Sequence, residues 1–458
     1  MATAVLDIGK TNVKVALFDG EGRRLAETSL PNASLPGPPY RHYDTGMIWR
    51  FLLSALAELA RTHAIETIVP TTHGATVAFV TDDPDVDEGL ALPIMDYEDP
   101  VVEAIEPDYA RLRPPFAETF SPPLGNGLNY GRQIAWMRKH HPDRMAAARA
   151  MLPYPQYWSW RLSGVMSAEP TSLGCHSDLW EPAHGRLSRL ATALDVHRLM
   201  PPVVHAFDRI GAIRPEIAAR TGLSPTTRIL SGIHDSNASL LPHLLTRQAP
   251  FTVISTGTWV VMMGVGAPLE RLDQRASMLA NVAADGRPVA CAIFMGGREF
   301  DVLTKGHPAV ATLADVEAVI GAGALALPCF SGEGGPFAQH AGRIEGTLPA
   351  CEGARAALAT LYSVLMTDHM LTRLGADAGA LVVEGGFVKS PLYAGLLAAL
   401  RPQQPMLIAD NTAGTAQGAA LLATWPKPPV DLSRPVSPLV PKGLDSYVRR
   451  WRDRVHHL

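Results

Sequence analysis

The chain has 458 residues, of which 47% are hydrophobic and 18% charged, and its formal net charge is −4. A single hydrophobic core rarely grows beyond roughly 250–300 residues, so this length predicts two domains. The small net charge and the scattered arginines give no basic patch, which excludes nucleic acid as the expected partner. No apolar run reaches the ~18 residues of a membrane helix, so no membrane partner is expected.

The cysteines and the N-terminus indicate a compartment. The four cysteines lie far apart and form neither a Cys-x-x-Cys pair nor a disulfide framework, which favours a reducing environment. Asp7 stands where a signal peptide would need its apolar segment. We therefore expect a cytoplasmic protein, for which a homodimer is one possible assembly.

Residues 6–14 read LDIGKTNVK, and the letters GKT suggest a nucleotide-binding P-loop. A P-loop needs a glycine five positions earlier, where this chain has Ala4, and it must open into a helix. The following VKVALFDG instead predicts a strand that ends in a turn. We therefore predict strand, tight turn, strand, with Asp7 at the end of the first strand.

Downstream, residues 44–60 have apolar side chains at helical spacing, and residues 66–74 predict a strand that ends in a polar turn. Residues 100–165 are rich in Pro, Tyr and Trp, with short helices near 130–140 and 155–162, and we interpret them as an insertion that lines a cleft. In SGIHDSNASLL, residues 231–241, Asp235 follows a short strand and precedes a helix. Asp235 is either a helix N-cap or a carboxylate that the helix N-terminus keeps ionised for use as a base.

The second half begins with another apolar hairpin, FTVISTGTWVVMMGV, at residues 251–265, so the chain contains a weak internal repeat. After it we predict a helix over 353–374, the strand ALVVEGG, a helix that starts after Ser390, the strand PMLIAD and the helix AGTAQGAALLATW. This alternation favours an α/β domain. The Pro-rich tail from Pro426 is expected to pack back on the surface.

Glycine turns and short hydroxyls suit phosphate, because backbone N–H and O–H groups donate without bulk. The two turns together could grip a polyphosphate, although each could also be an ordinary hairpin. Lys10 and Lys14 could contact phosphate or could be solvated. The glycines at 385, 386 and 414 could admit a flat ring or could serve close packing.

Polar groups at the ends of first-half strands could bind a sugar. These are His73, Gly74 and Asp96, and each could equally be structural. Cys175-His176 has no partners at zinc-ligand spacing, and no His-Glu-x-x-His occurs.

In this order, LDIGKTNVKVALFD, GIHDSNASLL, STGTW, VVEGGFVKSPLYAGLLA and AGTAQGAALLA resemble the FGGY carbohydrate kinases of the actin-like ATPase superfamily. The resemblance implies an α/β fold of two actin-like (ribonuclease-H-like) domains, with ATP, Mg²⁺ and a small-molecule sugar in a central cleft. The expected domains are residues 1–243, with the sugar and first phosphate segments, and 244–458, with the nucleotide segments and the tail 426–458.

The resemblance also implies residue roles. Asp235 would be the catalytic base, and Asp7 and Asp235 would face the magnesium. The expected nucleotide residues, besides Asp7, are Gly9, Thr11, Asn12, Thr256, Gly257, Thr258, Gly385, Gly386, Phe387 and Gly414. The expected sugar residues are His73, Gly74, Asp96, His234 and Asp235.

Two departures affect the expected function. Lys10 stands where many members have Thr or Gln, and Tyr97-Glu98 follows Asp96 where many have an Arg. The His234-Asp235 pair resembles the corresponding pair in kinases of the 6-deoxyketoses rhamnulose and fuculose. We therefore expect phosphorylation of such a ketose. The alternatives are a kinase of xylulose, ribulose or glycerol, an acyl-phosphate kinase, and a sugar- or nucleotide-sensing relative without catalysis.

Overall fold

The computed structural model describes residues 2–306, 310–409 and 414–458. Contacts between Cα atoms divide the chain into two compact units. Unit 1 comprises residues 1–246, 280–288 and 413–430, and unit 2 comprises 247–279, 289–412 and 431–458. The single division expected between residues 243 and 244 therefore differs from the observed units, because two later segments pack with the first half of the chain.

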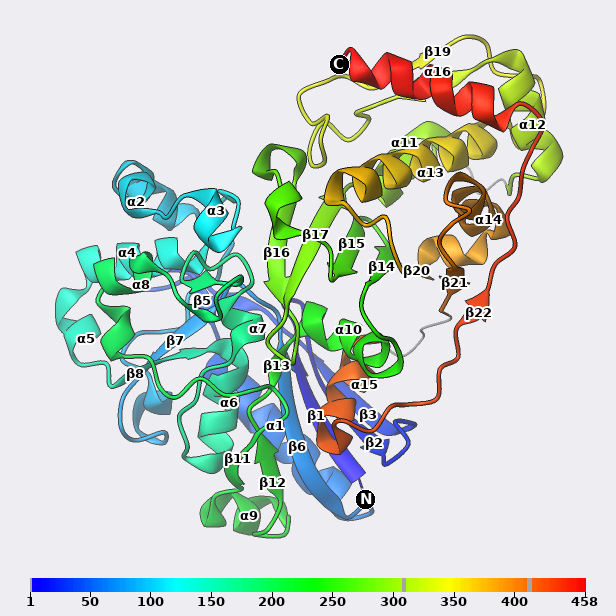
Figure 1. The fold of residues 1–458 in the computed structure, drawn as a ribbon. Helices are drawn as coiled ribbons and strands as arrows, with labels where there is room; N and C mark the ends of the chain where they lie inside the picture. The colour runs from blue at the N-terminus through cyan, green and yellow to red at the C-terminus, as the bar shows by residue number, and fades with distance from the viewer. Residues whose placement is uncertain (1, 307–309, 410–413) are drawn as a thin grey trace. The chain divides into compact units, whose positions relative to one another are not determined.

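A mixed sheet organises unit 1, in the order β11-β12-β6-β1-β2-β3, with β13 also paired to β6 (Figure 1). The β1–β2 and β2–β3 pairs are antiparallel, whereas β6 runs parallel to β1, β12 and β13. The strands are β1 Ala2–Ile8, β2 Asn12–Asp19, β3 Arg24–Pro31, β6 Ile65–Thr72, β11 Arg209–Ala212, β12 Arg228–Leu230 and β13 Ile233–His234.

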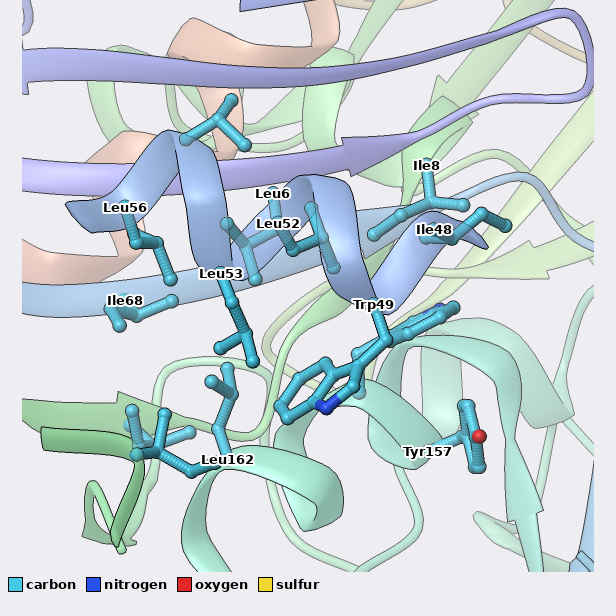
Figure 2. Packing of buried hydrophobic residues seen from close by; sticks show 14 of the residues in the cluster. Leu6, Ile8, Ile48, Trp49, Leu52, Leu53, Leu56, Ile68, Tyr157 and Leu162 are labelled. Atoms are coloured by element: carbon cyan, nitrogen blue, oxygen red, sulfur yellow. The ribbon is translucent and has the colours of Figure 1, made fainter. Parts of the chain in front are cut away.

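The first helix, α1 (Thr45–Ala60), shows how the sequence pattern forms the core of unit 1. It begins after Asp44, whose carboxylate accepts the Met47 backbone N–H at 2.7 Å. Its apolar residues recur at helical spacing, and Leu52, Leu53 and Leu56 lie in one cluster with Leu6 of β1 and Ile68 of β6 (Figure 2). The predicted helix over 44–60 is confirmed.

An insertion between β6 and β11 forms its own apolar cluster within unit 1. Its antiparallel pair is β7 (Val77–Val80) with β8 (Ala150–Pro153). The helices of the insertion are α2 Glu106–Leu112, α3 Phe116–Thr119, α4 Tyr130–His140, α5 Pro142–Ala146, α6 Tyr154–Ser163, α7 Pro170–Leu173 and α8 Arg189–Ala193. The helices expected near 130–140 and 155–162 are thus present, and the idea that the insertion lines a cleft stays a prediction.

Three more helices complete unit 1: α9 (Pro215–Thr221), α10 (Asp235–Thr246) and α15 (Gly414–Ala420). Helices α10 and α15 pack closely together. A Cβ at Gly418 of α15 would lie 1.9 Å from the Ala238 carbonyl oxygen of α10, so only glycine allows this approach. The late segment 413–430 joins unit 1 through this contact.

A second sheet has the order β16-β17-β15-β14-β20-β21-β22 and lies in unit 2, apart from residues 280–282 of β16 and the first residue of β17, which are grouped with unit 1. Its strands are β14 Phe251–Thr256, β15 Val260–Val265, β16 Met278–Val282, β17 Pro288–Phe294, β20 Ala380–Gly385, β21 Met406–Ile408 and β22 Arg434–Pro435. The run β17-β15-β14-β20-β21 repeats the run β3-β2-β1-β6-β12 of unit 1, with an antiparallel hairpin beside a parallel strand in each case. The predicted internal repeat is therefore structural.

The helices of unit 2 are α11 Gly296–Thr304, α12 Leu313–Ala322, α13 Ala354–Leu374, α14 Pro391–Leu400 and α16 Leu444–His456. The tail ends in α16, where the Tyr447 hydroxyl and the Trp451 indole donate to the carbonyls of Ala324 and Ala326 at 2.8 and 2.9 Å. The end of the tail therefore packs on unit 2. Among the described residues, no helix is both long and apolar enough to cross a lipid bilayer.

Candidate active site

Three parallel strands of unit 1 end at one edge of the sheet and carry polar residues there. Asp7 of β1 lies opposite Thr71 of β6, and His234 of β13 lies opposite Thr72. Asp235 follows His234 directly, and His73 follows Thr72. In open α/β sheets ligands bind outside the carboxyl ends of the strands. The register therefore brings the predicted base, the second carboxylate and the predicted sugar residues to one edge.

Asp235 is the first residue of α10, and its side chain is 32% exposed. Its Oδ1 accepts the Ser236 backbone N–H at 2.5 Å, within the first turn of the helix. This position suits a base, because the positive end of the helix dipole stabilises a carboxylate. The remaining exposure leaves the side chain accessible to a ligand.

His234 holds Asp235 from the buried side. The Asn237 side-chain amide donates to His234 Nδ1 at 2.9 Å, which places the imidazole proton on Nε2. Nε2 carries that proton and lies 3.1 Å from Asp235 Oδ1. Burial lowers the pKa of His234, which keeps the ring neutral. His234 is therefore placed to orient the carboxylate.

A second buried carboxyl supports this segment. Thr171 Oγ1 accepts the His234 backbone N–H at 3.1 Å and donates to Glu169 Oε2 at 2.5 Å. Glu169 also accepts the Thr171 backbone N–H at 2.9 Å. Burial raises the pKa of Glu169 to about 8, against the opposing effect of these hydrogen bonds. The chain Glu169, Thr171, His234 links the insertion to β13.

Asp7 is the second carboxylate of this edge. Burial, followed by the charge of Asp235, raises its pKa to about 6, and nearby Lys14 opposes this shift. Two carboxylates that repel each other are stabilised by a divalent cation. No group of three or more His, Cys, Asp or Glu side chains suited to a metal occurs among the described residues. Two carboxylates completed by water fit Mg²⁺, which keeps several waters in proteins.

The β1–β2 turn exposes Thr11 and Asn12, and Gly9 donates to the Asn12 carbonyl at 2.9 Å. The buried Asn32 donates two hydrogen bonds to carbonyls of the turn. Its backbone N–H donates to the Thr11 carbonyl at 2.8 Å, and its side-chain amide donates to the Gly9 carbonyl at 2.8 Å. Asn32 therefore fixes the turn through its carbonyls and leaves the side chains of Thr11 and Asn12 at the surface.

His73 lies among aromatic rings. Its Nδ1 donates to the Gly74 carbonyl at 2.9 Å, so Nε2 is an acceptor, and Nε2 has no partner among the described residues. Ring centroids of Tyr43, Tyr97 and Tyr154 lie 5.1, 5.4 and 5.2 Å from that of His73. A buried acceptor without a donor is unfavourable, and a ligand hydroxyl would satisfy it.

Gly74 is required by the approach of His234. A Cβ at this position would lie 2.6 Å from His234 Nε2, which is shorter than any real contact. Gly74 therefore allows the His73 segment and the His234 ring to lie close together. The nearby Phe79 is 1% exposed and belongs to the core of the insertion.

Asp96 is 1% exposed and is bound by cations and donors. Burial acts to raise its pKa, but the hydrogen bonds from Lys10 and Ser34 outweigh burial, and the pKa lies below its ordinary value. Asp96 also forms an ion pair with Arg41 at 3.0 Å. The residue expected to bind sugar is thus ionised and engaged within unit 1.

In unit 2 the predicted phosphate turn joins β14 to β15, and Gly257 donates to the Trp259 carbonyl at 2.9 Å. Gly257 and Thr258 are exposed. Thr256 is buried, and its hydroxyl donates to the Glu384 carbonyl at 2.5 Å while accepting the Phe387 backbone N–H at 3.0 Å. The free hydroxyl of this turn therefore belongs to Thr258.

Gly385 lies opposite Thr256 at the end of β20, with φ of 86°. A Cβ there would lie 2.1 Å from the Thr256 carbonyl oxygen. Phe387 stacks at a tilt with Phe300 and Tyr393, with centroids 5.5 and 4.8 Å away. Gly385, Gly386 and Phe387 belong to unit 2, whereas Gly414 opens α15 of unit 1.

Sequence reasoning missed Asn32, Asn237, Glu169 and the engagement of Asp96. Asn237 follows Asp235 by two positions on the same helix, and this spacing was the only sequence signal for it. Asn32 lies far along the chain from Gly9, and Thr171, which Glu169 binds, lies far along the chain from His234. No local pattern identifies such contacts.

Two family models match the chain. Residues 118–242 match the N-terminal domain of the FGGY family of carbohydrate kinases, and residues 248–430 match the carbohydrate kinase FGGY C-terminal domain. An L-fuculokinase from Escherichia coli (strain K12) is 27% identical over 270 residues, which are 57% of this chain and 55% of the relative. The chain thus spans about half the length of this curated relative.

Solved structures extend the similarity to the whole chain. The crystal structure of a carbohydrate kinase from Novosphingobium aromaticivorans has 38% sequence identity and a TM-score of 0.91, and the match covers 99% of this chain and 98% of that one. A xylulose kinase from Rhodospirillum rubrum, with 19% identity and a TM-score of 0.79 over 100% of this chain and 99% of that one, shares the fold. The chain therefore belongs to the FGGY family of carbohydrate kinases, with their two-domain, actin-like α/β fold.

Proposed function

We propose that this protein transfers the γ-phosphoryl group of ATP to a hydroxyl of a ketose, with Asp235 as the general base. The proposal rests on the residues gathered at the carboxyl ends of β1, β6 and β13. Asp235 lies there beside His234 and near Asp7, and the same edge carries His73, whose Nε2 is a buried acceptor without a partner among the described residues. The carboxylate takes the proton of the attacking hydroxyl as the oxygen–phosphorus bond forms, and ADP leaves.

Asp7 and Asp235 would hold Mg²⁺, since both are carboxylates and their mutual repulsion raises the pKa of Asp7. When bound, the ion would neutralise charge on phosphate oxygens. In unit 1, Thr11 and Asn12 would donate to phosphate, while the Gly9 N–H holds the turn by donating to the Asn12 carbonyl. In unit 2 the exposed Thr258 would donate to phosphate, while the Gly257 N–H holds its turn by donating to the Trp259 carbonyl. Gly385, Gly386 and Phe387 would border the adenosine.

For the sugar we propose a 6-deoxyketose such as L-fuculose or L-rhamnulose. The rings of Tyr43, Tyr97 and Tyr154 around His73 would accept a methyl group, and His73 Nε2 would accept one hydroxyl. The similarity to L-fuculokinase supports this choice. Xylulose is the second candidate, because a xylulose kinase shares the fold.

A coupled ADP-release assay over ketoses, aldoses and polyols, ranked by kcat/KM, tests the proposal. We expect L-fuculose and L-rhamnulose to exceed D-xylulose, L-ribulose and glycerol, because a site that bonds a hydroxyl rejects analogues that lack it by as much as ~10⁴–10⁵-fold. Glycerol or an aldose as the best substrate would overturn the ketose assignment. No sugar-dependent release over the whole panel would favour a sensing protein.

A further inference from the structure

Lys10 of the β1–β2 turn reaches the segment that follows Met95. Its ammonium forms an ion pair with Asp96 Oδ1 and lies 3.3 Å from Glu98 Oε2. It also lies over two aromatic rings, 5.3 Å from the centroid of Tyr43 and 4.9 Å from that of Tyr97. The side chain is 22% exposed, so Lys10 is held in place and still accessible.

Asp96, in contrast, already accepts three hydrogen bonds and forms an ion pair with Arg41. A carboxylate offers about four lone-pair sites. Oδ1 accepts from Lys10 and, at 2.9 Å, from the Glu98 backbone N–H. Oδ2 accepts from the Ser34 hydroxyl at 2.6 Å and contacts Arg41 Nε at 3.0 Å. A sugar hydroxyl could bind Asp96 only by displacing one of these four partners.

The surroundings of Lys10 coincide with the proposed sugar residues. Tyr43 and Tyr97 flank both Lys10 and His73, and the positive charge of Lys10 contributes to lowering the pKa of His73 after the larger effect of burial. An ammonium has three N–H donors, and two carboxylates account for two of them. One donor therefore remains, and the shared neighbours Tyr43 and Tyr97 place the ammonium in the same group of side chains as the His73 ring.

We propose that Lys10, not Asp96, is the charged sugar contact of unit 1 and determines specificity by donating its remaining N–H to a hydroxyl or carbonyl oxygen of the substrate. Asp96 and Glu98 act as positioning residues that hold the ammonium. With His73 as acceptor and Lys10 as donor, the site would select a sugar that places one oxygen at each of these two groups. This inference rests on the proposed sugar kinase function and adds a residue to it.

Arg41 provides a matched control. It pairs with the same carboxylate, Asp96, and lies 3.6 Å from the same Glu98, but its side chain is 39% exposed. Within the part of the chain that the structure describes, it lies over no tyrosine ring, unlike Lys10. If Lys10 acted only by neutralising Asp96, then Lys10→Met and Arg41→Met would have similar effects. If Lys10 contacts the sugar, the two variants differ.

The experiment measures KM for the best ketose, KM for ATP and kcat in the wild-type protein, Lys10→Met, Arg41→Met and Lys10→Arg, with thermal unfolding as a check of folding. For Lys10→Met we expect the sugar KM to rise about 10- to 100-fold, as for loss of a charged hydrogen bond, with the ATP KM within about threefold. For Arg41→Met we expect a sugar KM within about threefold of wild type. Lys10→Arg should recover part of the loss.

Equal effects of Lys10→Met and Arg41→Met on the sugar KM would overturn the inference in favour of a structural ion pair. A rise confined to the ATP KM would overturn it in favour of a phosphate contact. Titration calorimetry of ketose binding to the folded variants, in the absence of ATP, makes the same comparison without turnover. A wild-type protein that neither binds nor phosphorylates any ketose would instead reject the proposed function.

Discussion

The β1–β2 turn of unit 1 and the β14–β15 turn of unit 2 occupy the same place in sheets of the same strand order. Their surroundings differ in chemistry. Titratable side chains gather at the edge in unit 1, namely Asp7, Lys10, His73, His234 and Asp235. The corresponding edge in unit 2 presents glycines, hydroxyls and the ring of Phe387.

Under the proposed function, this one strand arrangement would serve two tasks. The edge of unit 1 would move a proton and bind a cation through Asp7 and Asp235. The edge of unit 2 offers neutral donors and close backbone approach, which suit phosphate and a flat ring. Substitutions in unit 1 should therefore change turnover and pH dependence, whereas those in unit 2 should change stability and nucleotide affinity.

The largest effect is expected at Asp235. Asp235→Asn removes the proton acceptor and nearly preserves the shape, so kcat should fall by at least the ~10²–10⁴-fold typical of general-base loss. Nucleotide affinity should change little. Steady-state kinetics with the best ketose and nucleotide titration measure both quantities. Turnover within a few-fold of wild type would reduce Asp235 to a helix cap.

In unit 2, Gly385→Ala should destabilise the protein by roughly 2–4 kcal/mol, because φ is 86° and the new Cβ would meet the Thr256 carbonyl at 2.1 Å. The adjacent Gly386→Ala is the matched control, since the new Cβ would lie 3.6 Å from the Thr256 carbonyl oxygen, an ordinary contact distance. Denaturant unfolding of the two variants measures the difference. Equal stabilities would contradict the proposed close approach of β14 and β20.

The buried Glu169 gives unit 1 a dependence on pH. Its pKa is raised from 4.5 to about 8 in the folded state, so its stabilising contribution is complete below about 4.5 and is lost as the pH rises towards about 8. We expect wild type to lose up to about 2 kcal/mol between about pH 6 and about pH 8 relative to Glu169→Gln, which does not titrate. Melting temperatures of both proteins across this pH range test the prediction. Parallel plots of melting temperature against pH for wild type and Glu169→Gln would refute it.

The smallest effect is expected at Thr258. Thr258→Val replaces an exposed hydroxyl by a methyl group, and loss of one hydrogen bond should raise the ATP KM by up to about 10-fold with little change in melting temperature. Thr256→Val should do the reverse and lower the melting temperature, because the Thr256 hydroxyl joins Glu384 to Phe387. Identical profiles for the two variants would show that the turn does not divide these roles.

The sequence by itself determined the elements whose signals are local. The apolar spacing of α1, the two hairpins and the glycine that ends α13 all follow from residues within a few positions of one another. The ordered motifs also indicated the family and placed Asp7 and Asp235 at strand ends. These features are predictable because periodicity, turns and caps depend on neighbouring residues.

Only the tertiary structure decided which polar groups are already engaged. Asp96 is bound by Lys10, Ser34 and Arg41, and the Thr256 hydroxyl is used within unit 2. The joining of residues 413–430 to unit 1 depends on α10 and α15 meeting at Gly418. These outcomes depend on residues that lie tens to hundreds of positions apart in the sequence. A buried carboxylate binds the donors that the fold brings within hydrogen-bond distance. No local sequence pattern shows which donors those are.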